Sequence, residues 1–113
     1  MNKRIVFRNM DKSDAIERYA NERLEKIVDF LATEPTPISI DLVLEPSAAR
    51  EHHRVELRVK TPRYDLIADR EHQGDDFYKT LDHVIDVMFR NLIEAKRKAL
   101  DERDHGTGSV KKF

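Results

Sequence analysis

The longest patterned stretch of the chain follows Asp75 and Asp76. Its apolar residues recur at steps of three and four, which is the spacing of one face of an α-helix. They are Leu81, Val84, Ile85, Met88, Leu92, Ala95 and Ala99. The pattern predicts an amphipathic helix from about Asp76 to about Arg103. Acidic residues suit the start of a helix, so we interpret Asp75 and Asp76 as a cap and a first-turn acid rather than as paired catalytic carboxylates.

A second helical pattern lies nearer the N-terminus. Ser13 is a favourable N-cap residue, and Asp14 stands in the first turn, where a negative charge suits the helix dipole. Apolar residues then recur at helical spacing as far as Leu31, and Pro35 and Pro37 end the pattern. These apolar residues are Ala15, Ile16, Tyr19, Ala20, Leu24, Ile27, Val28 and Leu31.

Four shorter segments have the composition of β-strands. Residues 38–45 and 54–60 alternate apolar and polar side chains, as strands buried on one face do. Residues 4–7 and 64–69 are short strands by the same criteria. The order of elements is therefore βαβββα, an α+β fold in which the three consecutive strands form an antiparallel meander.

Such a sheet has one apolar face that needs cover, and the two amphipathic helices can supply it. We therefore predict a four-stranded sheet with both helices packed on one face. The expected core unites helix residues Ile16, Tyr19, Leu24, Ile27, Leu81, Ile85, Met88 and Leu92 with strand residues Ile40, Leu42, Val55, Leu57 and Val59.

The remaining segments are polar. The length of 113 residues suits one domain, which we place at residues 1–104. Residues 105–113 contain two glycines and no periodicity, and they are predicted to be a flexible tail. His52 and His53 are expected in a polar hairpin loop, and residues 70–74 in a polar connection.

The composition limits the classes of function. Charged residues make up 38% of the chain, yet the formal net charge is −1. A globally basic nucleic-acid binder is thereby excluded, so a polyanion site has to arise from local segregation of charge. No segment has the apolar run of a signal peptide or a membrane span, which predicts a cytoplasmic protein that does not contact membranes.

Catalytic motifs are scarce. The chain has no cysteine and three glycines, and it lacks an HExxH motif, a nucleophile elbow and a phosphate-binding glycine loop. The adjacent His52 and His53 can ligate a metal, but a polar loop accounts for them better. We therefore predict that the chain is not an enzyme and needs no cofactor, metal or small-molecule substrate.

Basic residues on the two predicted helices are the main candidates for function. Arg23 and Lys26 flank the apolar stripe of the first helix. On the second helix the basic residues are Lys79, His83, Arg90, Lys96, Arg97 and Lys98. Cations spread over several turns suit the distributed charges of a nucleic-acid backbone. Acidic residues interleave with them, however, so a solvated, salt-bridged face is the alternative.

Short motifs along nearly the whole chain resemble those of the ribosome hibernation factors. This family contains hibernation-promoting factor and the ribosome-associated inhibitor protein Y, and some members are labelled as sigma-factor modulation proteins. The first half carries Ile5-Val6-Phe7-Arg8-Asn9-Met10, Asp14-Ala15-Ile16, Tyr19-Ala20 and Arg23-Leu24-Glu25-Lys26-Ile27. The second half carries Asp76-Phe77-Tyr78, Leu81-Asp82, Ile85-Asp86, Arg90-Asn91-Leu92 and Lys96-Arg97-Lys98. Their joint order and spacing make the resemblance specific.

The resemblance implies a fold like that of double-stranded-RNA-binding domains and a role on the ribosome. Such bacterial proteins bind the small ribosomal subunit through its RNA, in the channel for messenger and transfer RNA. They silence idle ribosomes under stress, as in stationary phase, and catalyse no reaction. The RNA-binding residues carried over by position are Arg23, Lys26, Arg90, Lys96 and Lys98. The charge pattern adds Arg58, Lys79 and Arg97.

The chain also departs from the family pattern. Glu94 and Val87 stand where relatives commonly carry basic residues. Long relatives continue into a second domain that pairs two ribosomes, and this chain is expected to lack that domain. The alternative function is a module of the same fold that acts on a protein partner, as in sigma-factor modulation, without binding ribosomes. A face interrupted by Glu22, Glu25, Asp86 and Glu94 would favour that alternative.

Overall fold

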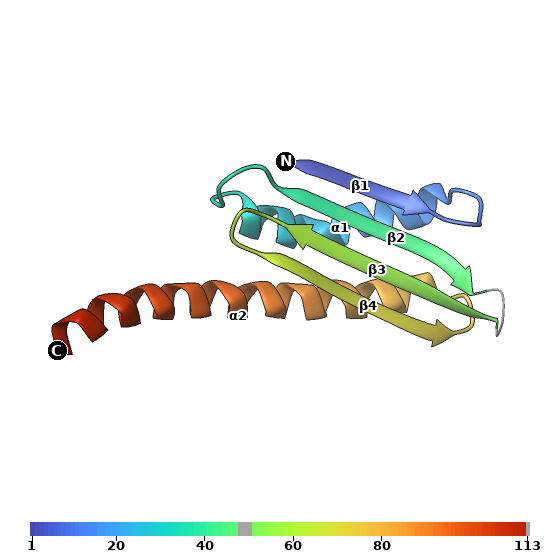
Figure 1. Ribbon diagram of the computed structural model, residues 1–113. Helices are drawn as coiled ribbons and strands as arrows, with labels where there is room; N and C mark the ends of the chain where they lie inside the picture. The colour runs from blue at the N-terminus through green and yellow to red at the C-terminus, as the bar shows by residue number, and fades with distance from the viewer. Residues whose placement is uncertain (48–50, 113) are drawn as a thin grey trace.

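The computed structural model describes residues 1–47 and 51–112, with side chains described as far as Asp101. Its elements confirm the predicted order βαβββα (Figure 1). They are β1 (Asn2–Phe7), α1 (Asp14–Leu31), β2 (Ser39–Ser47), β3 (His52–Lys60), β4 (Asp65–Gln73) and α2 (Phe77–Lys112).

The strands form one mixed sheet in the order β1-β2-β3-β4. β2, β3 and β4 pair antiparallel, which confirms the predicted meander. β1 pairs parallel with β2, so that Ile5 lies opposite Leu42. A parallel pair needs a crossover connection, and α1 provides it.

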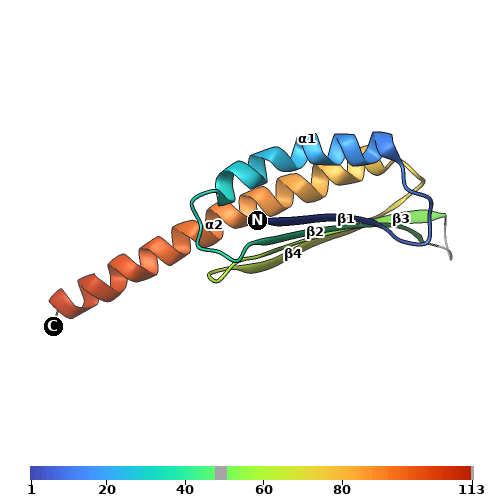
Figure 2. The same ribbon diagram turned by 90° about the horizontal axis from the view of Figure 1, so that it is seen from above.

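Both helices lie on the same face of the sheet, as predicted (Figure 2). Alternate residues of β2 and β3 are buried beneath them. Ile16 and Tyr19 are partly buried against this core. The fully buried side chains come from every predicted apolar stripe and include Leu24, Ile27, Leu31, Ile40, Leu42, Leu57, Leu81, Ile85, Met88 and Leu92.

Both helices begin with a capping side chain, and that of α1 is the predicted Ser13. The Ser13 hydroxyl accepts a hydrogen bond from the Ile16 N–H at 3.2 Å. The Asp76 carboxylate accepts one from the Lys79 N–H at 3.3 Å. Each cap satisfies a backbone donor that has no partner within the helix. The sequence predicts Asp75 as the cap and Asp76 as a first-turn acid, whereas in the structure Asp76 is the cap and the first turn of α2 contains no acidic residue.

The two adjacent histidines lie in a strand and not in a loop, contrary to the prediction. β3 begins at His52, and His53 is only 1% exposed. The His53 ring has Nδ1 2.7 Å from the Gly74 carbonyl oxygen and Nε2 2.5 Å from the Thr80 hydroxyl. The sequence obscured this because a histidine with two partners can occupy an inward position that the alternation rule reserves for apolar residues.

β4 is also longer than predicted, because it continues through Gln73. His52 pairs with Gln73, which extends the β3–β4 ladder beyond Asp69. Residues 70–73 are polar on both faces, so their alternation does not reveal a strand. Gly74 then turns the chain at φ +90°, a conformation that glycine adopts without strain.

The second helix does not end near Arg103 but at Lys112. Residues 105–112 therefore belong to α2, and the flexibility predicted for residues 105–113 stays a prediction. No proline interrupts this stretch. Gly106 and Gly108 each disfavour a helix by only about 1 kcal/mol, so the backbone can continue through them. The end of α2 projects beyond the sheet (Figures 1 and 2).

Truncation of Leu57 or Ile85 to alanine should destabilise the protein by about 2–5 kcal/mol. Both side chains are buried, at 0% and 1% exposure, and each truncation leaves a cavity between the sheet and the helices. Denaturant unfolding measures the change. Ile67→Ala is the control because Ile67 is 56% exposed on β4. If Leu57→Ala costs no more than Ile67→Ala, the sheet and helices do not share this core.

Candidate nucleic-acid interface

The two helices run side by side (Figure 2). Ion pairs join their facing edges. Arg23 of α1 has its Nε atom 3.2 Å from an Asp82 carboxylate oxygen of α2. One turn further on, the Lys26 ammonium group lies 2.5 Å from the Asp86 carboxylate. Two of the predicted RNA-binding residues therefore lie together, each beside an acidic residue of the other helix.

Aromatic rings fill the positions before and after these pairs. Tyr19 packs edge-on against Tyr78 at 4.9 Å between ring centroids, and its hydroxyl donates to Asp82 at 2.8 Å. Phe30 and Phe89 pack edge-on at 5.8 Å. We call this line of rings and ion pairs the helix seam.

Basic side chains lie over the seam rings. The Arg23 guanidinium is 5.0 Å from the Tyr19 ring centroid, and the Lys26 ammonium is 5.1 Å from that of Phe89. Lys96 lies over the Phe30 ring at 5.2 Å. An exposed cation–π contact stabilises by about 0.5–1 kcal/mol, so these cations are held in place as well as partly neutralised.

Charge along the seam cancels locally. The hydrogen bond from Lys26 lowers the pKa of Asp86, with further lowering by Arg90 and Arg23. The hydrogen bond from Arg97 likewise lowers the pKa of Glu94. Both carboxylates are therefore ionised at neutral pH. The face is interrupted by acidic residues, which is the feature expected of the protein-partner alternative.

A row of cations remains on the outer side of α2, away from the sheet. Lys79, Arg90 and Arg97 are exposed there, 11 and 7 residues apart and therefore on one side of the helix. Lys98 is also exposed but lies about 100° round the helix from Arg97. Arg97 pairs with Glu94 at 2.6 Å, while Arg90 reaches the Asp86 backbone carbonyl at 3.5 Å. Among the side chains that the structure describes, Lys79, Arg90 and Lys98 have no carboxylate within 4.0 Å. From Lys79 to Arg97 the row spans about 27 Å at a rise of 1.5 Å per residue.

Arg58 lies apart from this row, on the open face of the sheet. Its guanidinium pairs with Asp65 at 2.9 and 2.8 Å. The sequence contained a signal for this position. Val55, Leu57 and Val59 of β3 face the helices, so the alternating Arg58 has to point to the other side of the sheet. The structure therefore does not bring Arg58 together with the basic residues of the helices.

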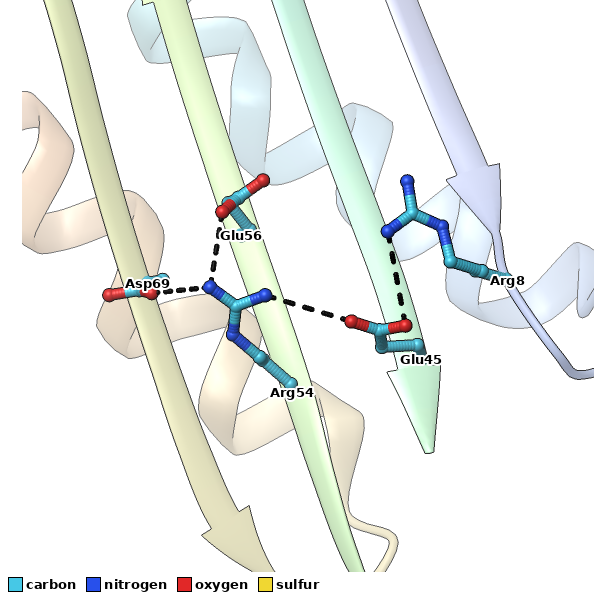
Figure 3. A network of polar contacts seen from close by, with 5 residues as sticks. All are labelled: Arg8, Glu45, Arg54, Glu56 and Asp69. Atoms are coloured by element: carbon cyan, nitrogen blue, oxygen red, sulfur yellow. Dashed lines mark hydrogen bonds and ion pairs between the residues drawn. The ribbon is translucent and has the colours of Figure 1, made fainter. Parts of the chain in front are cut away.

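The face of the sheet turned away from the helices, here called the open face, carries a network of opposite charges (Figure 3). Arg54 contacts Glu45 at 3.6 Å, Glu56 at 3.1 Å and Asp69 at 2.6 Å. Arg8 extends the network to Glu45 at 4.0 Å. The strand register produces it, since Glu45 pairs directly with Arg54. Because each cation of this network faces a carboxylate, the network itself offers a polyanion little uncompensated positive charge.

Several residues of this surface were missed by reasoning from the sequence. Asp82 had been assigned no role, and Phe30 and Phe89 were not placed in either apolar stripe. A signal was available for Asp82 and Asp86, which are four residues apart and so lie on one side of a helix. Their partners on α1 are about sixty positions away, with Lys26 and Asp86 separated by 60. No local pattern identifies such partners.

Two kinds of feature are absent from the described part of the chain. Within it, no helix has the length and apolar character needed to cross a membrane. Among the described side chains, no three histidine, aspartate or glutamate residues are grouped as a metal site would require.

Two solved structures have a similar fold. A ribosomal subunit interface protein from Coxiella burnetii is 22% identical with a TM-score of 0.67, and the match covers 86% of this chain and 99% of that chain. The N-terminal domain of Protein Y from Thermus thermophilus is 24% identical with a TM-score of 0.62, covering 86% and 98% respectively. At these identities the likeness establishes the shared fold.

Sequence comparison identifies the family. A search among curated proteins finds no match. The family model described as "Sigma 54 modulation protein / S30EA ribosomal protein" matches residues 4–99, from β1 to the middle of α2. The match includes every predicted site residue and confirms the resemblance seen in the motifs. The chain therefore belongs to the Sigma 54 modulation protein / S30EA ribosomal protein family.

Proposed function

We propose that this protein is a cytoplasmic, ribosome-associated translation inhibitor. It binds the small ribosomal subunit through ribosomal RNA in the channel for messenger and transfer RNA, and it silences idle ribosomes under stress without catalysing a reaction. Membership of the family supports a ribosomal role. So do the names of the two similar proteins, a ribosomal subunit interface protein and Protein Y.

The observation that carries the proposal is the row of exposed cations on the outer side of α2. Lys79, Arg90 and Lys98 have no carboxylate within 4.0 Å among the described side chains. Such ammonium and guanidinium groups can replace the counterions of an RNA backbone. The row is straight and rigid because the opposite side of the same helix is anchored in the core by Leu81, Met88 and other apolar residues.

The proposed contacts fall into two groups. Lys79, Arg90 and Lys98 form the primary group, and Lys96 and Arg97 extend it along the helix. Arg23 and Lys26 form a secondary group, because each has to exchange a carboxylate for a phosphate before it can bind RNA. We leave Arg58 out of the site, because it projects from the opposite side of the sheet.

Arg90→Glu should impair binding to the small subunit while the protein stays folded. Arg90 is exposed, so its replacement should change the free energy of unfolding by no more than about 0.5 kcal/mol. Loss of one phosphate contact should also reduce the salt slope of binding by about one. Cosedimentation with purified small subunits at two salt concentrations measures both effects, and a cell-free translation assay measures the relief of inhibition.

Lys60→Glu is the matched control for this experiment. It makes the same change of charge at an exposed residue, but on the open face of the sheet. Equal loss of binding in both variants would mean that overall charge, rather than the row on α2, determines binding. Normal binding by a folded Arg90→Glu variant would exclude Arg90 as a contact.

Asp86→Asn should strengthen binding, which is the opposite of the usual effect of a substitution in an interface. The change removes the acidic partner of Lys26 and frees that ammonium group for a phosphate. The lost ion pair is exposed and should cost less than about 1 kcal/mol of stability. Tighter cosedimentation and a steeper salt dependence are expected. Weaker binding would show that RNA binding requires the Lys26–Asp86 pair, rather than that Asp86 competes with RNA for Lys26.

A protein partner is the second candidate function, because charge along the helix seam cancels locally. Paired charges beside aromatic rings suit a protein surface better than a phosphate backbone. The family description also includes sigma 54 modulation. If the unaltered protein fails to cosediment with small subunits at low salt, the ribosomal proposal fails and this alternative takes its place.

A further inference from the structure

A second basic region lies near the start of α2, on the side of the helix that faces β4. An open pocket of about 440 Å³ is lined there by Arg70 and His72 of β4 and by Lys79 and His83 of α2. β4 brings the first two residues to the helix side, since Arg70 pairs with the buried Val55. This pocket is separate from the helix seam, which lies on the edge of α2 that faces α1.

The pocket holds two permanent positive charges with little compensation. Its one carboxylate, that of Asp76, already accepts the N-cap hydrogen bond from the Lys79 backbone. Neither Arg70 nor Lys79 has a carboxylate within 4.0 Å among the described side chains. Most other arginines do have one, namely Arg4, Arg8, Arg23, Arg54, Arg58, Arg63 and Arg97.

The partner of Arg70 is unusual for an arginine. Its guanidinium donates to the Nε2 atom of His83 at 3.1 Å. Because arginine can only donate, this contact requires His83 to accept with the lone pair of Nε2. The guanidinium carries five N–H donors in a planar fork that matches the oxygens of a phosphate. A phosphate oxygen between Arg70 and His83 would give the fork a charged acceptor and allow the imidazole to donate as well.

We propose that Arg70, Lys79 and His83 bind a dianionic phosphoryl group, either a phosphate monoester or the diphosphate of a small molecule or an RNA end. The two permanent cations match its charge, whereas an internal phosphodiester of RNA carries a single negative charge. The volume is within the range of small-ligand pockets, so it can hold the group attached to the phosphate. The proposal does not depend on ribosome binding, although Lys79 belongs to both sites.

Pyrophosphate is a suitable probe, with binding followed by calorimetry and by the NMR signals of the His83 ring. Arg70→Gln should weaken binding about tenfold or more, because a hydrogen bond to a charged group contributes about 1.5–3 kcal/mol. Lys79→Gln should also weaken it. Arg18→Gln is the matched control, since Arg18 is exposed on α1 and has no carboxylate within 4.0 Å among the described side chains.

The source of the phosphoryl group is tested with two RNA oligonucleotides that differ only in a 5′-phosphate. The phosphorylated one should displace pyrophosphate, and the one with a 5′-hydroxyl should not. Equal displacement by both would overturn the proposal in favour of backbone recognition. It would also be overturned if pyrophosphate leaves the His83 signals unchanged, or if folded Arg70→Gln binds as the control does. Failure to cosediment with ribosomes would leave these measurements unaffected.

Discussion

The burial of one face of the sheet is the constraint on which the rest of the structure depends. Alternate residues of β2 and β3 are completely buried, and apolar burial is the main favourable contribution to folding. Each helix has a single apolar stripe, so both have to lie on that face with their polar sides outward. The helices therefore lie next to each other, and the opposite face of the sheet remains open.

This arrangement divides the abundant charge into surfaces with different properties. On the open face, the strand register places acidic residues opposite basic ones, and the network around Arg54 follows (Figure 3). Such exposed pairs contribute little to stability individually, but they leave a neutral surface. On the outer row of α2, Arg97 is paired with Glu94, whereas Lys79 and Arg90 have no carboxylate within 4.0 Å among the described side chains. A chain with a net charge of −1 can therefore still present a positive surface to RNA.

The helix seam connects the core to the proposed function. Tyr19, Arg23 and Lys26 hold α1 to α2 through Asp82 and Asp86. The buried apolar stripe of α2 fixes its orientation about its own axis, the seam contacts add to it, and this orientation determines which cations point outward. In the proposed complex, the same acidic residues would compete with RNA for Arg23 and Lys26. Whether Arg23 and Lys26 hold the helices together or bind RNA would depend on whether they bind the carboxylates of α2 or a phosphate more strongly.

The sequence by itself determined the elements, their order and the side of each that is buried. These follow from local periodicity, because a helix repeats every 3.6 residues and a strand every two. It also identified an acidic start of α2, though with the cap one residue too early, and the basic residues of α2 as candidates. The periodicity did not predict the burial of His53, because this residue is polar and is buried together with its hydrogen-bond partners.

Only the tertiary structure decided which charges are neutralised and which remain available. Tyr19 and Asp82 are separated by 63 positions, and nothing in either local sequence encodes their contact. In the same way, Arg58 is one basic residue among many in the sequence. Its position in β3 points it away from the helices, and this separates it from their basic residues only once the sheet has formed. Charge pairing depends on side-chain distances across elements, and those distances exist only after the core has packed.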